Sequence, residues 1–503
     1  MLERIGRSYG LRMRVLHSHA AELSGFARRL LLVIGCAMVV LIGPLSAGAA
    51  NAQPVQQDTR TEEVEFQSHG TTLHGTVYLP PGAVARSPGV VLVHGSGKGQ
   101  RAQYVPEAQA FARAGIVTLA FDKRTDGYSV THRDYAQLAD DALAGVELLR
   151  TRPDVDASKV GLWGLSEGAW VSPIAAAKSP DVAFVVTIGG SGQPPLRQST
   201  WSADNVLRHH GVSGSLLDAV AGPGGQFLDS LGVFPEADHD PAAVLRQVHQ
   251  PVLALWGERD TQSPPAESAR IFQQALSENP HATLRFVHLA AHNGHRTSDG
   301  FDRVGGAVVN GRTLGELMPG YADVITAWIH EVAAGNPPSS SLIGPMPRQE
   351  ALSRPVSDVS WYESAFVRIG MLVLMLIGFL GYPLTAWIGS KSDATQSKSI
   401  RRWSGLLALL GIVTVVGTVG YLLWLFSFGG QTESAFFAGQ PLVWLLLHIL
   451  ASLVLLTAIA TGFVWWRMRA ATTGAFRLRL AVLLCTAAIF IPWALTWRVL
   501  LPY

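Results

Sequence analysis

One pentapeptide constrains the fold of this chain more than any other stretch. Gly164-Leu165-Ser166-Glu167-Gly168 follows a strand pattern at 158–163, which ends in the apolar stretch 160–163, and precedes a helical pattern at 169–178. A strand that leads through Gly-x-Ser-x-Gly into a helix is the context of a nucleophile elbow, in which a tight turn exposes a serine hydroxyl. The residues two before and two after that serine must lack bulk, and both are glycine. The sequence therefore predicts a reactive Ser166 rather than an ordinary turn with a surface serine.

Strand-like and helix-like segments alternate along the first two thirds of the chain. After a hairpin at 62–68 and 72–79, we expect strands at 89–93, 116–121, 158–163, 182–188, 252–256 and 283–289. We expect helices at 104–114, 134–150, 169–178, 266–276 and 321–334. This alternation predicts an α/β domain with a mostly parallel sheet that helices cover on both faces. Residues 191–250 break the rhythm, and we interpret them as a cap inserted over the carboxyl edge of the sheet, where ligands bind in such folds.

A serine hydroxyl needs an adjacent base, which is itself oriented by an acid. Asp260 and His292 follow the ends of two successive predicted strands, and the chain order Ser166, Asp260, His292 is the one that accompanies a nucleophile elbow. Glu258 is a rival acid, although it lies closer to its strand. We therefore assign Ser166, Asp260 and His292 as the catalytic residues.

Two further histidines compete with His292 for the role of base. His288 lies within a predicted strand, where a packed or edge residue is expected, and His295 lies three residues beyond His292, where it could line a pocket. His292 follows two small residues after the strand, so that a loop can turn its ring toward the serine. This position favours His292.

The oxyanion of a tetrahedral intermediate needs two backbone N–H donors. One is expected from Glu167, directly after the serine, and the other from the loop His94-Gly95-Ser96-Gly97, at Ser96. We expect His94 to hold this loop in place. The loop continues into Lys98-Gly99 but lacks the Gly-Lys-Ser/Thr ending of a phosphate loop, so nucleotide binding is not expected.

Four stretches resemble motifs of the bacterial α/β-hydrolase superfamily, in its acylaminoacyl-peptidase-like and BAAT-like esterase branch. They are His94–Gly97, Asp122-Lys123-Arg124, Pro153–Asp156 and Gly164–Gly168. The resemblance extends over about 62–334 and implies the α/β-hydrolase fold and hydrolysis of an ester, thioester or amide, without a metal or an organic cofactor. Thr125 stands where this branch usually has glycine, so the loop over the site is expected to differ there.

The N-terminus has the pattern of a signal peptide, which we place at residues 1–52. Six arginines precede an apolar run at 30–42, and small residues lead to Ala50-Asn51-Ala52, so cleavage is expected before Gln53. If cleavage fails, the segment becomes an anchor with the same orientation. Cys36 and Cys485 both lie in apolar segments, so the globular part holds no disulfide and no thiolate metal site.

The C-terminal third is mostly apolar and predicts an all-α region of four transmembrane helices. The expected spans are 369–388, 405–426, 442–466 and 480–497. Basic residues cluster in the first and third connecting loops, whereas 428–440 has none, so these two loops are expected to be cytoplasmic. We therefore divide the chain into a hydrolase domain at 53–335 with its cap, a linker at 336–365 and a four-span region at 366–503. His448 lies within a span and is expected to hydrogen-bond between helices.

These observations together predict a membrane-anchored serine hydrolase. Its partners would be a small-molecule acyl ester or peptide substrate and the lipid bilayer, with the catalytic domain on the periplasmic or extracellular side of a bacterial cytoplasmic membrane. A net charge of +2 gives no reason to expect nucleic acid binding. The alternatives are a serine peptidase with the same triad, an acyltransferase whose site excludes water, and a non-catalytic membrane scaffold.

Overall fold

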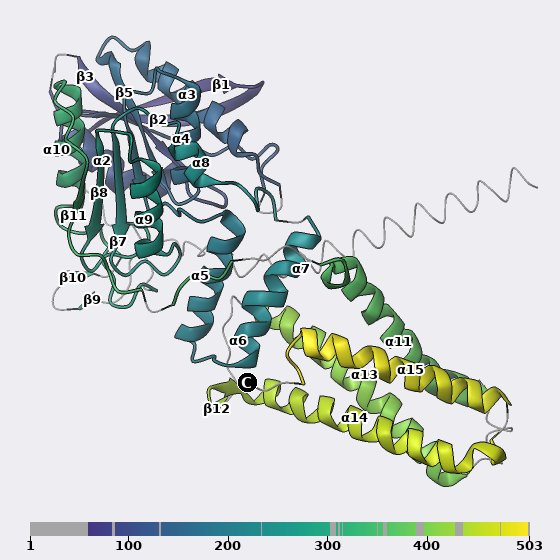
Figure 1. The fold of residues 1–503 in the computed structure, drawn as a ribbon. Helices are drawn as coiled ribbons and strands as arrows, with labels where there is room; N and C mark the ends of the chain where they lie inside the picture. The colour runs from purple at the N-terminus through teal and green to yellow at the C-terminus, as the bar shows by residue number, and fades with distance from the viewer. Residues whose placement is uncertain are drawn as a thin grey trace, which may run out of the picture. The chain divides into compact units, whose positions relative to one another are not determined.

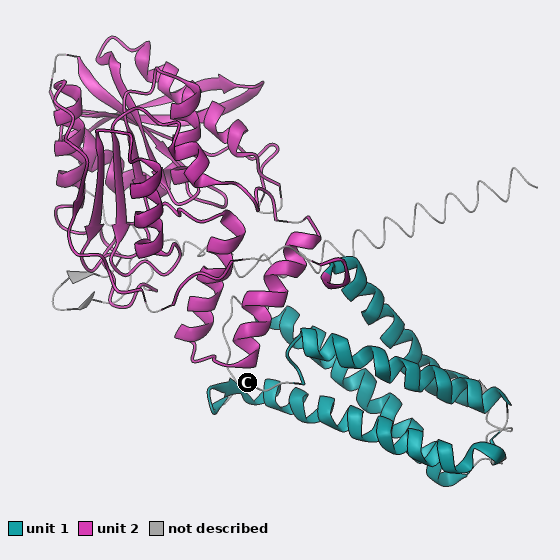
Figure 2. Ribbon diagram, in the orientation of Figure 1, with its two compact units in different colours: residues 1–41, 364–503 teal, residues 42–363 magenta. Residues whose placement is uncertain are grey.

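A computed structural model describes residues 59–82, 86–129, 132–232, 234–301, 308–309, 312–313, 315–349, 351–355, 360–388, 397–427, 436–472 and 474–500. The chain divides between Glu363 and Ser364 into two compact units, coloured separately in Figure 2. The first holds the sheet and the second holds the long apolar helices. The expected signal peptide at 1–52 lies outside the described residues.

The globular unit is built on one sheet, in which nine described strands have the order β1-β2-β4-β3-β5-β6-β7-β8-β11. β2 pairs antiparallel with β1 and β4, and the remaining pairs are parallel. The strands are β1 (Arg60–Ser68), β2 (Thr71–Leu79), β3 (Ser87–Val93), β4 (Val117–Phe121), β5 (Val155–Leu165), β6 (Val185–Ile188), β7 (Val252–Gly257), β8 (Ala282–Val287) and β11 (Ser341–Ile343). The expected hairpin and all six expected parallel strands are therefore present.

Helices cover both faces of this sheet, as Figure 1 shows. The helices that pack on it are α2 (Val105–Arg113), α3 (Tyr135–Arg150), α4 (Gly168–Lys178), α9 (Pro265–Ala275) and α10 (Tyr321–Ala333), and a 3₁₀ turn at Arg101–Tyr104 leads into α2. One core joins the sheet to α3, α4 and α9, and a second joins its other face to α2 and α10. The five predicted helices are confirmed to within two residues at each end.

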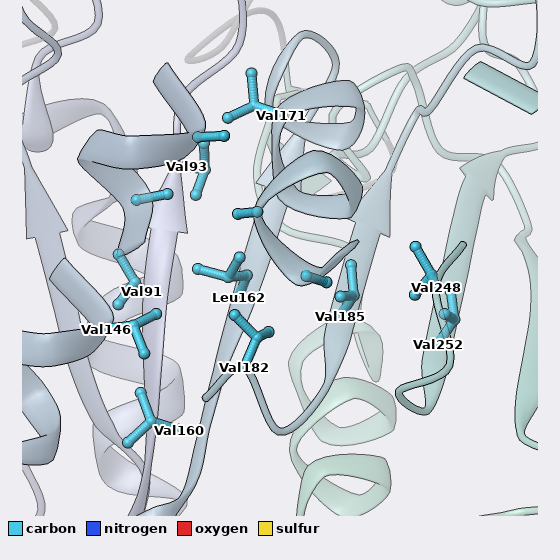
Figure 3. Close-up of a cluster of buried hydrophobic side chains, with 14 of the residues drawn as sticks. Val91, Val93, Val146, Val160, Leu162, Val171, Val182, Val185, Val248 and Val252 are labelled. Atoms are coloured by element: carbon cyan, nitrogen blue, oxygen red, sulfur yellow. The ribbon is translucent and has the colours of Figure 1, made fainter. Parts of the chain in front are cut away.

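The second half of the central strand β5, residues 160–164, is buried on both faces, which explains why this stretch is continuously apolar. Leu162 points into the core beneath α3 and α4, which Figure 3 shows as a cluster of valine and leucine side chains, and Trp163 points into the opposite core. Neither side chain is accessible to solvent, and burial of Leu162 alone stabilises the fold by about 1.5–3 kcal/mol. The strand that leads to Ser166 is thus fixed from both sides.

The segment predicted as a cap is helical. It contains α5 (Pro195–His209), α6 (Ser215–Ala219), a π-helical turn at Val220–Gly224, α7 (Gly225–Ser230) and α8 (Pro241–Leu245). α5 is attached to the loop after β7, because the amides of Gln198 and Asn205 donate to the backbone carbonyls of Gln262 and Thr261. Since that loop leaves the carboxyl end of β7, α5 lies at the edge of the sheet where the cap was expected.

The segment expected as a linker, 336–365, is in part built into the globular unit. Ser341–Ile343 forms β11, which pairs parallel with β8 at the edge of the sheet. Ser353 then donates its amide to Glu267 of α9 and accepts from Arg197 of α5, and the Trp201 indole donates to the Ala351 carbonyl. The globular unit therefore continues well beyond residue 335, and the division at Glu363 falls near the end of the expected linker.

The second unit contains four long helices: α11 (Ala365–Ile388), α13 (Lys398–Ser427), α14 (Leu442–Met468) and α15 (Gly474–Thr496). All four are long and apolar enough to cross a membrane. α11 begins four residues before the expected span and so includes Arg368, which is buried beside the Trp497 ring. The His448 ring bonds to the backbone carbonyl of Val499, which follows α15, so this acceptor lies beyond the end of the neighbouring helix and not within it as expected.

The remaining described elements are two short strand pairs and two 3₁₀ turns. They are the two-residue strands β9 (Val308–Val309) and β10 (Arg312–Thr313), the strands β12 (Phe436–Phe437) and β13 (Gln440–Pro441), and 3₁₀ turns at Trp361–Glu363 and Arg469–Ala471. β9 pairs with β10 and β12 with β13, both antiparallel. Neither pair joins the main sheet.

Candidate active site

Ser166 occupies the turn between β5 and α4 with a left-handed backbone. Its φ is 55°, a conformation rare for residues other than glycine, and its amide donates to the Ile188 carbonyl at 2.9 Å. Backbone strain of this kind persists only where the surroundings enforce it, and it is common at functional sites. The backbone at Ser166 therefore has the geometry of a nucleophile elbow.

No residue larger than glycine fits at the positions two before and two after Ser166. A Cβ at Gly164 would lie 2.1 Å from the Gly168 carbonyl oxygen, and a Cβ at Gly168 would lie 2.3 Å from that of Val93. The ideal Cβ position of Gly95, in the loop after β3, lies 3.5 Å from the Cβ of Ser166. The loop predicted to supply an oxyanion donor thus packs directly beside the serine.

Asp260 and His292 form a buried hydrogen-bonded pair. His292 Nδ1 donates to Asp260 Oδ2 at 2.8 Å, and the side chains are 7% and 0% exposed. The other carboxylate oxygen accepts the backbone N–H groups of Gln262 and Ser263, at 2.8 Å each. These bonds fix the carboxylate, which in turn fixes the tautomer of the ring and leaves His292 Nε2 as its free, basic nitrogen.

The end of β6 brings Ser166 and His292 to the same place. Ser166 is bonded to the carbonyl of Ile188, and the His292 ring lies against the next residue, Gly189. A Cβ at Gly189 would lie 2.7 Å from both Cε1 and Nδ1 of that ring. No hydrogen bond joins the Ser166 hydroxyl to His292 in the described structure, and His292 Nε2 is buried without a protein partner there. Catalytic hydrogen bonds commonly tighten only once substrate is bound.

The rival acid and bases lie in other contacts. Glu258 accepts a 2.5 Å bond from His288, which is mostly exposed, so these two residues form a surface pair. His295 is buried, and its two ring nitrogens face the Glu107 carboxylate at 3.0 Å and the Gly315 carbonyl at 2.7 Å. Within the described ranges, no three His, Cys, Asp or Glu side chains are grouped to hold a metal ion.

The backbone N–H groups proposed as oxyanion donors make no hydrogen bond to the described protein. The neighbours of Ser96 are engaged, since the amides of Gly95 and Gly97 donate to the hydroxyls of Tyr104 and Tyr128 at 3.1 and 3.0 Å. The amides of Ser96 and Glu167 have no such partner there. Both groups are therefore free to bind an oxygen of a substrate.

Sequence reasoning missed the side chain of Glu167, which is the centre of a buried cluster. Its carboxylate accepts from Lys123 at 2.7 Å, from Tyr128 at 2.9 Å and from Arg133 at 2.9 Å, and we call these four residues the Glu167 network. Burial opposes ionisation of Glu167, but Lys123 and Arg133 outweigh it and hold the pKa of the carboxyl below its usual value. The signal in the sequence was Asp122-Lys123-Arg124, although nothing in it indicated the partner of Lys123.

His94 is a buried neutral residue in the loop after β3. Its Nε2 bonds to the carbonyl of Phe121 at 2.5 Å, which ties the loop to the end of β4 as expected. Burial, helped by the nearby charge of Lys123, lowers the pKa of His94 to about 3. The ring is therefore uncharged at neutral pH and lies too deep to serve as a second base.

Comparisons with known proteins give partial matches. Residues 144–296 match the family described as BAAT / Acyl-CoA thioester hydrolase C terminal. Thiohydrolase apmlB of Arthrinium phaeospermum is 32% identical over 133 residues, which are 25% of this chain and 42% of that protein. Esterase EstD of Thermotoga maritima is 28% identical over 226 residues, which are 40% of this chain and 52% of that protein. The chain thus spans about half the length of these relatives.

Among solved structures, a 2,6-dihydroxy-pseudo-oxynicotine hydrolase is similar with a TM-score of 0.40 and 17% identity. That match covers 56% of this chain and 71% of the other. The fold is identified from the structure itself, by three features. These are the strand order of the sheet, the left-handed Ser166 between β5 and α4, and the positions of Asp260 and His292 after β7 and β8. The globular unit has the α/β-hydrolase fold, and its residues 144–296 are similar to the BAAT / acyl-CoA thioester hydrolase family.

Proposed function

We propose that this protein is a membrane-anchored serine hydrolase that cleaves an ester or thioester through an acyl-enzyme. Ser166 is the nucleophile, His292 the general base and then acid, and Asp260 the residue that orients His292. The observation that carries the proposal is the buried His292–Asp260 pair, whose ring lies against Gly189 beside the residue that binds the Ser166 amide. No resident cofactor takes part in this scheme.

The proposed reaction has two steps. Ser166 Oγ attacks the acyl carbonyl carbon while His292 Nε2 takes the hydroxyl proton, and the carbonyl oxygen becomes an oxyanion held by the amides of Ser96 and Glu167. When the tetrahedral centre collapses, the bond to the leaving group breaks and His292 returns the proton to that group. Water, deprotonated by His292, then attacks the acyl-serine. The bond to Ser166 Oγ breaks, His292 returns the proton to that oxygen, and the acid is released.

The comparisons support an acyl substrate but leave its leaving group open. The family match at 144–296 includes Ser166, Asp260 and His292, and the relatives with printed activities include an esterase and thiohydrolases. An ester or thioester is therefore the leading substrate class. A serine peptidase would use the same residues, and an acyltransferase would replace the second-step water with another nucleophile.

Covalent labelling of the full chain tests this function. A fluorophosphonate probe should label the wild type purified in detergent, and Ser166→Ala should abolish the label while the protein stays folded. If the folded wild type is not labelled, the chain is a scaffold rather than a serine hydrolase. A panel of p-nitrophenyl esters, acyl-CoA thioesters and aminoacyl-p-nitroanilides then separates the classes, and turnover of anilides alone would replace the esterase proposal with a peptidase.

We also propose that the four helices of the second unit anchor the enzyme in a bacterial cytoplasmic membrane, with 1–52 as its signal peptide. The basic residues before and after these helices favour a cytoplasmic location for the loops near 389–397 and 469–473. α11 then begins on the outer side, directly after the globular unit, so the catalytic domain would face the periplasm or the exterior.

A further inference from the structure

The two proposed oxyanion donors come from segments far apart in the sequence. Glu167 lies in the turn after β5, and Ser96 lies in the loop after β3. Removing one oxyanion donor costs about 10²–10³ in rate, and small displacements of reacting groups are also expensive. Contacts that fix these two segments relative to each other would therefore increase the rate of the reaction.

Lys123 connects these two segments. Its ammonium group has three N–H donors and meets three acceptors: the Gly95 carbonyl, the Glu167 carboxylate at 2.7 Å and the Tyr128 hydroxyl at 3.2 Å. Every proton of the ammonium group is thus engaged, and the side chain is only 5% exposed. One contact lies on the residue before Ser96, and another lies on the residue whose amide is the second donor.

Tyr128 connects them a second time. Its hydroxyl accepts the Gly97 amide at 3.0 Å and donates to the Glu167 carboxylate at 2.9 Å. Ser96 is therefore bracketed, because the residues before and after it are held by Lys123 and Tyr128, and both of these are bonded to Glu167. Arg133 binds the remaining carboxylate oxygen and fixes the orientation of the group.

From these contacts we infer that Lys123, Tyr128 and the side chain of Glu167 are positioning residues that fix the two oxyanion donors relative to each other. Glu167 would serve twice, with its amide as one donor and with its carboxylate as the anchor of the loop that carries the other. This inference rests on the proposed function. It assigns a role to a cluster that touches neither His292 nor Asp260 through any described hydrogen bond.

The test measures the second-order rate of fluorophosphonate labelling. Attack of Ser166 on the probe's phosphorus expels fluoride and gives a phosphonyl-serine, a step that uses the same donors and needs no known substrate. Tyr128→Phe removes one hydroxyl and keeps the ring, so the protein should fold with little change in Tm. Labelling should slow by roughly tenfold, less than for loss of a donor, since both amides remain but are held less well. The contact between His292 and Asp260 is untouched by this change, so the shape of the pH–rate profile should stay the same.

Asp141→Asn is the matched control. Asp141 pairs with Arg124, next to Lys123 in the sequence, and this ion pair is as deeply buried as the Glu167 network but makes no described contact with the loop at 94–97. The control should lower Tm and leave the labelling rate unchanged at a temperature well below unfolding. Equal slowing in Asp141→Asn and Tyr128→Phe would mean a general loss of rigidity and would overturn the inference.

A second set of variants tests the inference in case the loss of the Tyr128 hydroxyl alone has no effect on the labelling rate. Lys123→Met and Glu167→Gln should each slow labelling, and the double variant should be slower by less than the product of the two effects, because the residues act on the same contact. Unchanged labelling in Tyr128→Phe and Lys123→Met would overturn the inference but leave the hydrolase intact. A wild type that is never labelled would overturn the proposed function itself, so the two failures are distinguishable.

Discussion

Asp260 is more firmly held than an acid that only contacts its histidine. Two backbone amides and the His292 ring share its carboxylate, and none of this group is exposed. Asp260→Asn should therefore keep the fold but present an amide to the ring, which favours the wrong tautomer of His292. We expect the rate of fluorophosphonate labelling to fall by on the order of 10³–10⁴.

Glu258→Gln provides the comparison for this change. Its partner His288 is mostly exposed, so the substitution should alter the labelling rate by less than about twofold. If Glu258→Gln and Asp260→Asn slowed labelling equally, the assignment of the acid to Asp260 would have to be abandoned.

Gly189 offers a second prediction at the residue scale. Its φ is +60°, and a Cβ there would lie 2.7 Å from the His292 ring. Gly189→Ala should push the ring away from Ser166 and reduce labelling at least 10²-fold, as misplacement of a catalytic group by about an ångström does. Gly70→Ala is the control, because its φ of +79° imposes similar backbone strain but no atom lies within 4 Å of the added methyl. Comparable losses of labelling in the two variants would contradict the steric explanation.

Single residues also show how far the sequence could be interpreted. The His292–Asp260 contact was predictable, because both residues follow strand ends and parallel strands end at one edge of a sheet. The partner of Lys123 was not, because Glu167 lies 44 positions away and meets it through loops whose course depends on the packed structure. Residue type and spacing indicate which chemistry is present, but contacts between loop side chains depend on the fold.

Among the elements, the strands and helices of the sheet were predicted well and the segment after α10 was not. Ser341–Ile343 is too short to show an apolar alternation, and it follows a Pro/Ser-rich stretch that suggests an extended linker. Its three residues form a strand only because the edge of β8 offers unpaired backbone groups. The strand exists through its tertiary pairing, which a local pattern does not contain.

The loop after β3 should make the globular unit sensitive to acid through His94. The pKa of His94 is lowered to about 3 in the folded protein. Between about pH 6.5 and pH 3, the His94 ring is therefore protonated in the unfolded state but not in the folded state. Protonation of His94 therefore does not lower the free energy of unfolding above about pH 6.5. Below that pH, the free energy of unfolding falls by about 1.4 kcal/mol per pH unit. His94→Gln, which keeps a donor for Phe121, should be less stable at pH 7, but the difference from wild type should narrow toward pH 4. Denaturant unfolding of the full chain in detergent measures the free energy of unfolding of both proteins at each pH. A difference between wild type and His94→Gln that stayed the same from pH 7 to pH 4 would contradict this prediction.

The loop after β8 should show the opposite dependence through His295. Burial disfavours the charged ring, but the hydrogen bond to Glu107 and its charge prevail, so the pKa of His295 is raised above its usual value. Its contribution to stability is therefore complete below about pH 6.5 and is lost as the pH rises through the higher folded pKa. Glu107→Gln should lower stability more at pH 6 than at pH 8.5. Glu258→Gln, beside the exposed His288, should show no such trend, and a Glu107→Gln effect independent of pH would refute this pairing.

At the scale of the whole molecule, the second unit satisfies many of its polar groups within its own helices. The hydroxyls of Thr414, Thr457 and Thr461 each donate to a backbone carbonyl four residues earlier. Gly378 allows α11 to approach Thr486 of α15 closely, since a Cβ there would overlap its hydroxyl. Small residues and internally bonded hydroxyls are what helices packed in a bilayer require.

The charges that flank these helices predict the orientation of the whole chain. Positive loops stay on the cytoplasmic side, so the start of α13 should be inside, and the globular unit, which directly precedes α11, should be outside. Cysteines introduced at two exposed positions test this, Ser399→Cys at the start of α13 and Ser277→Cys in the globular unit, both in a chain with Cys36 and Cys485 replaced. A membrane-impermeant maleimide should label Ser277→Cys in spheroplasts and Ser399→Cys only after permeabilisation. The reverse labelling pattern would place the globular unit in the cytoplasm and restrict its substrates to acyl compounds present there. The expected pattern instead requires substrates that reach the outer face of the membrane or arrive through the lipid.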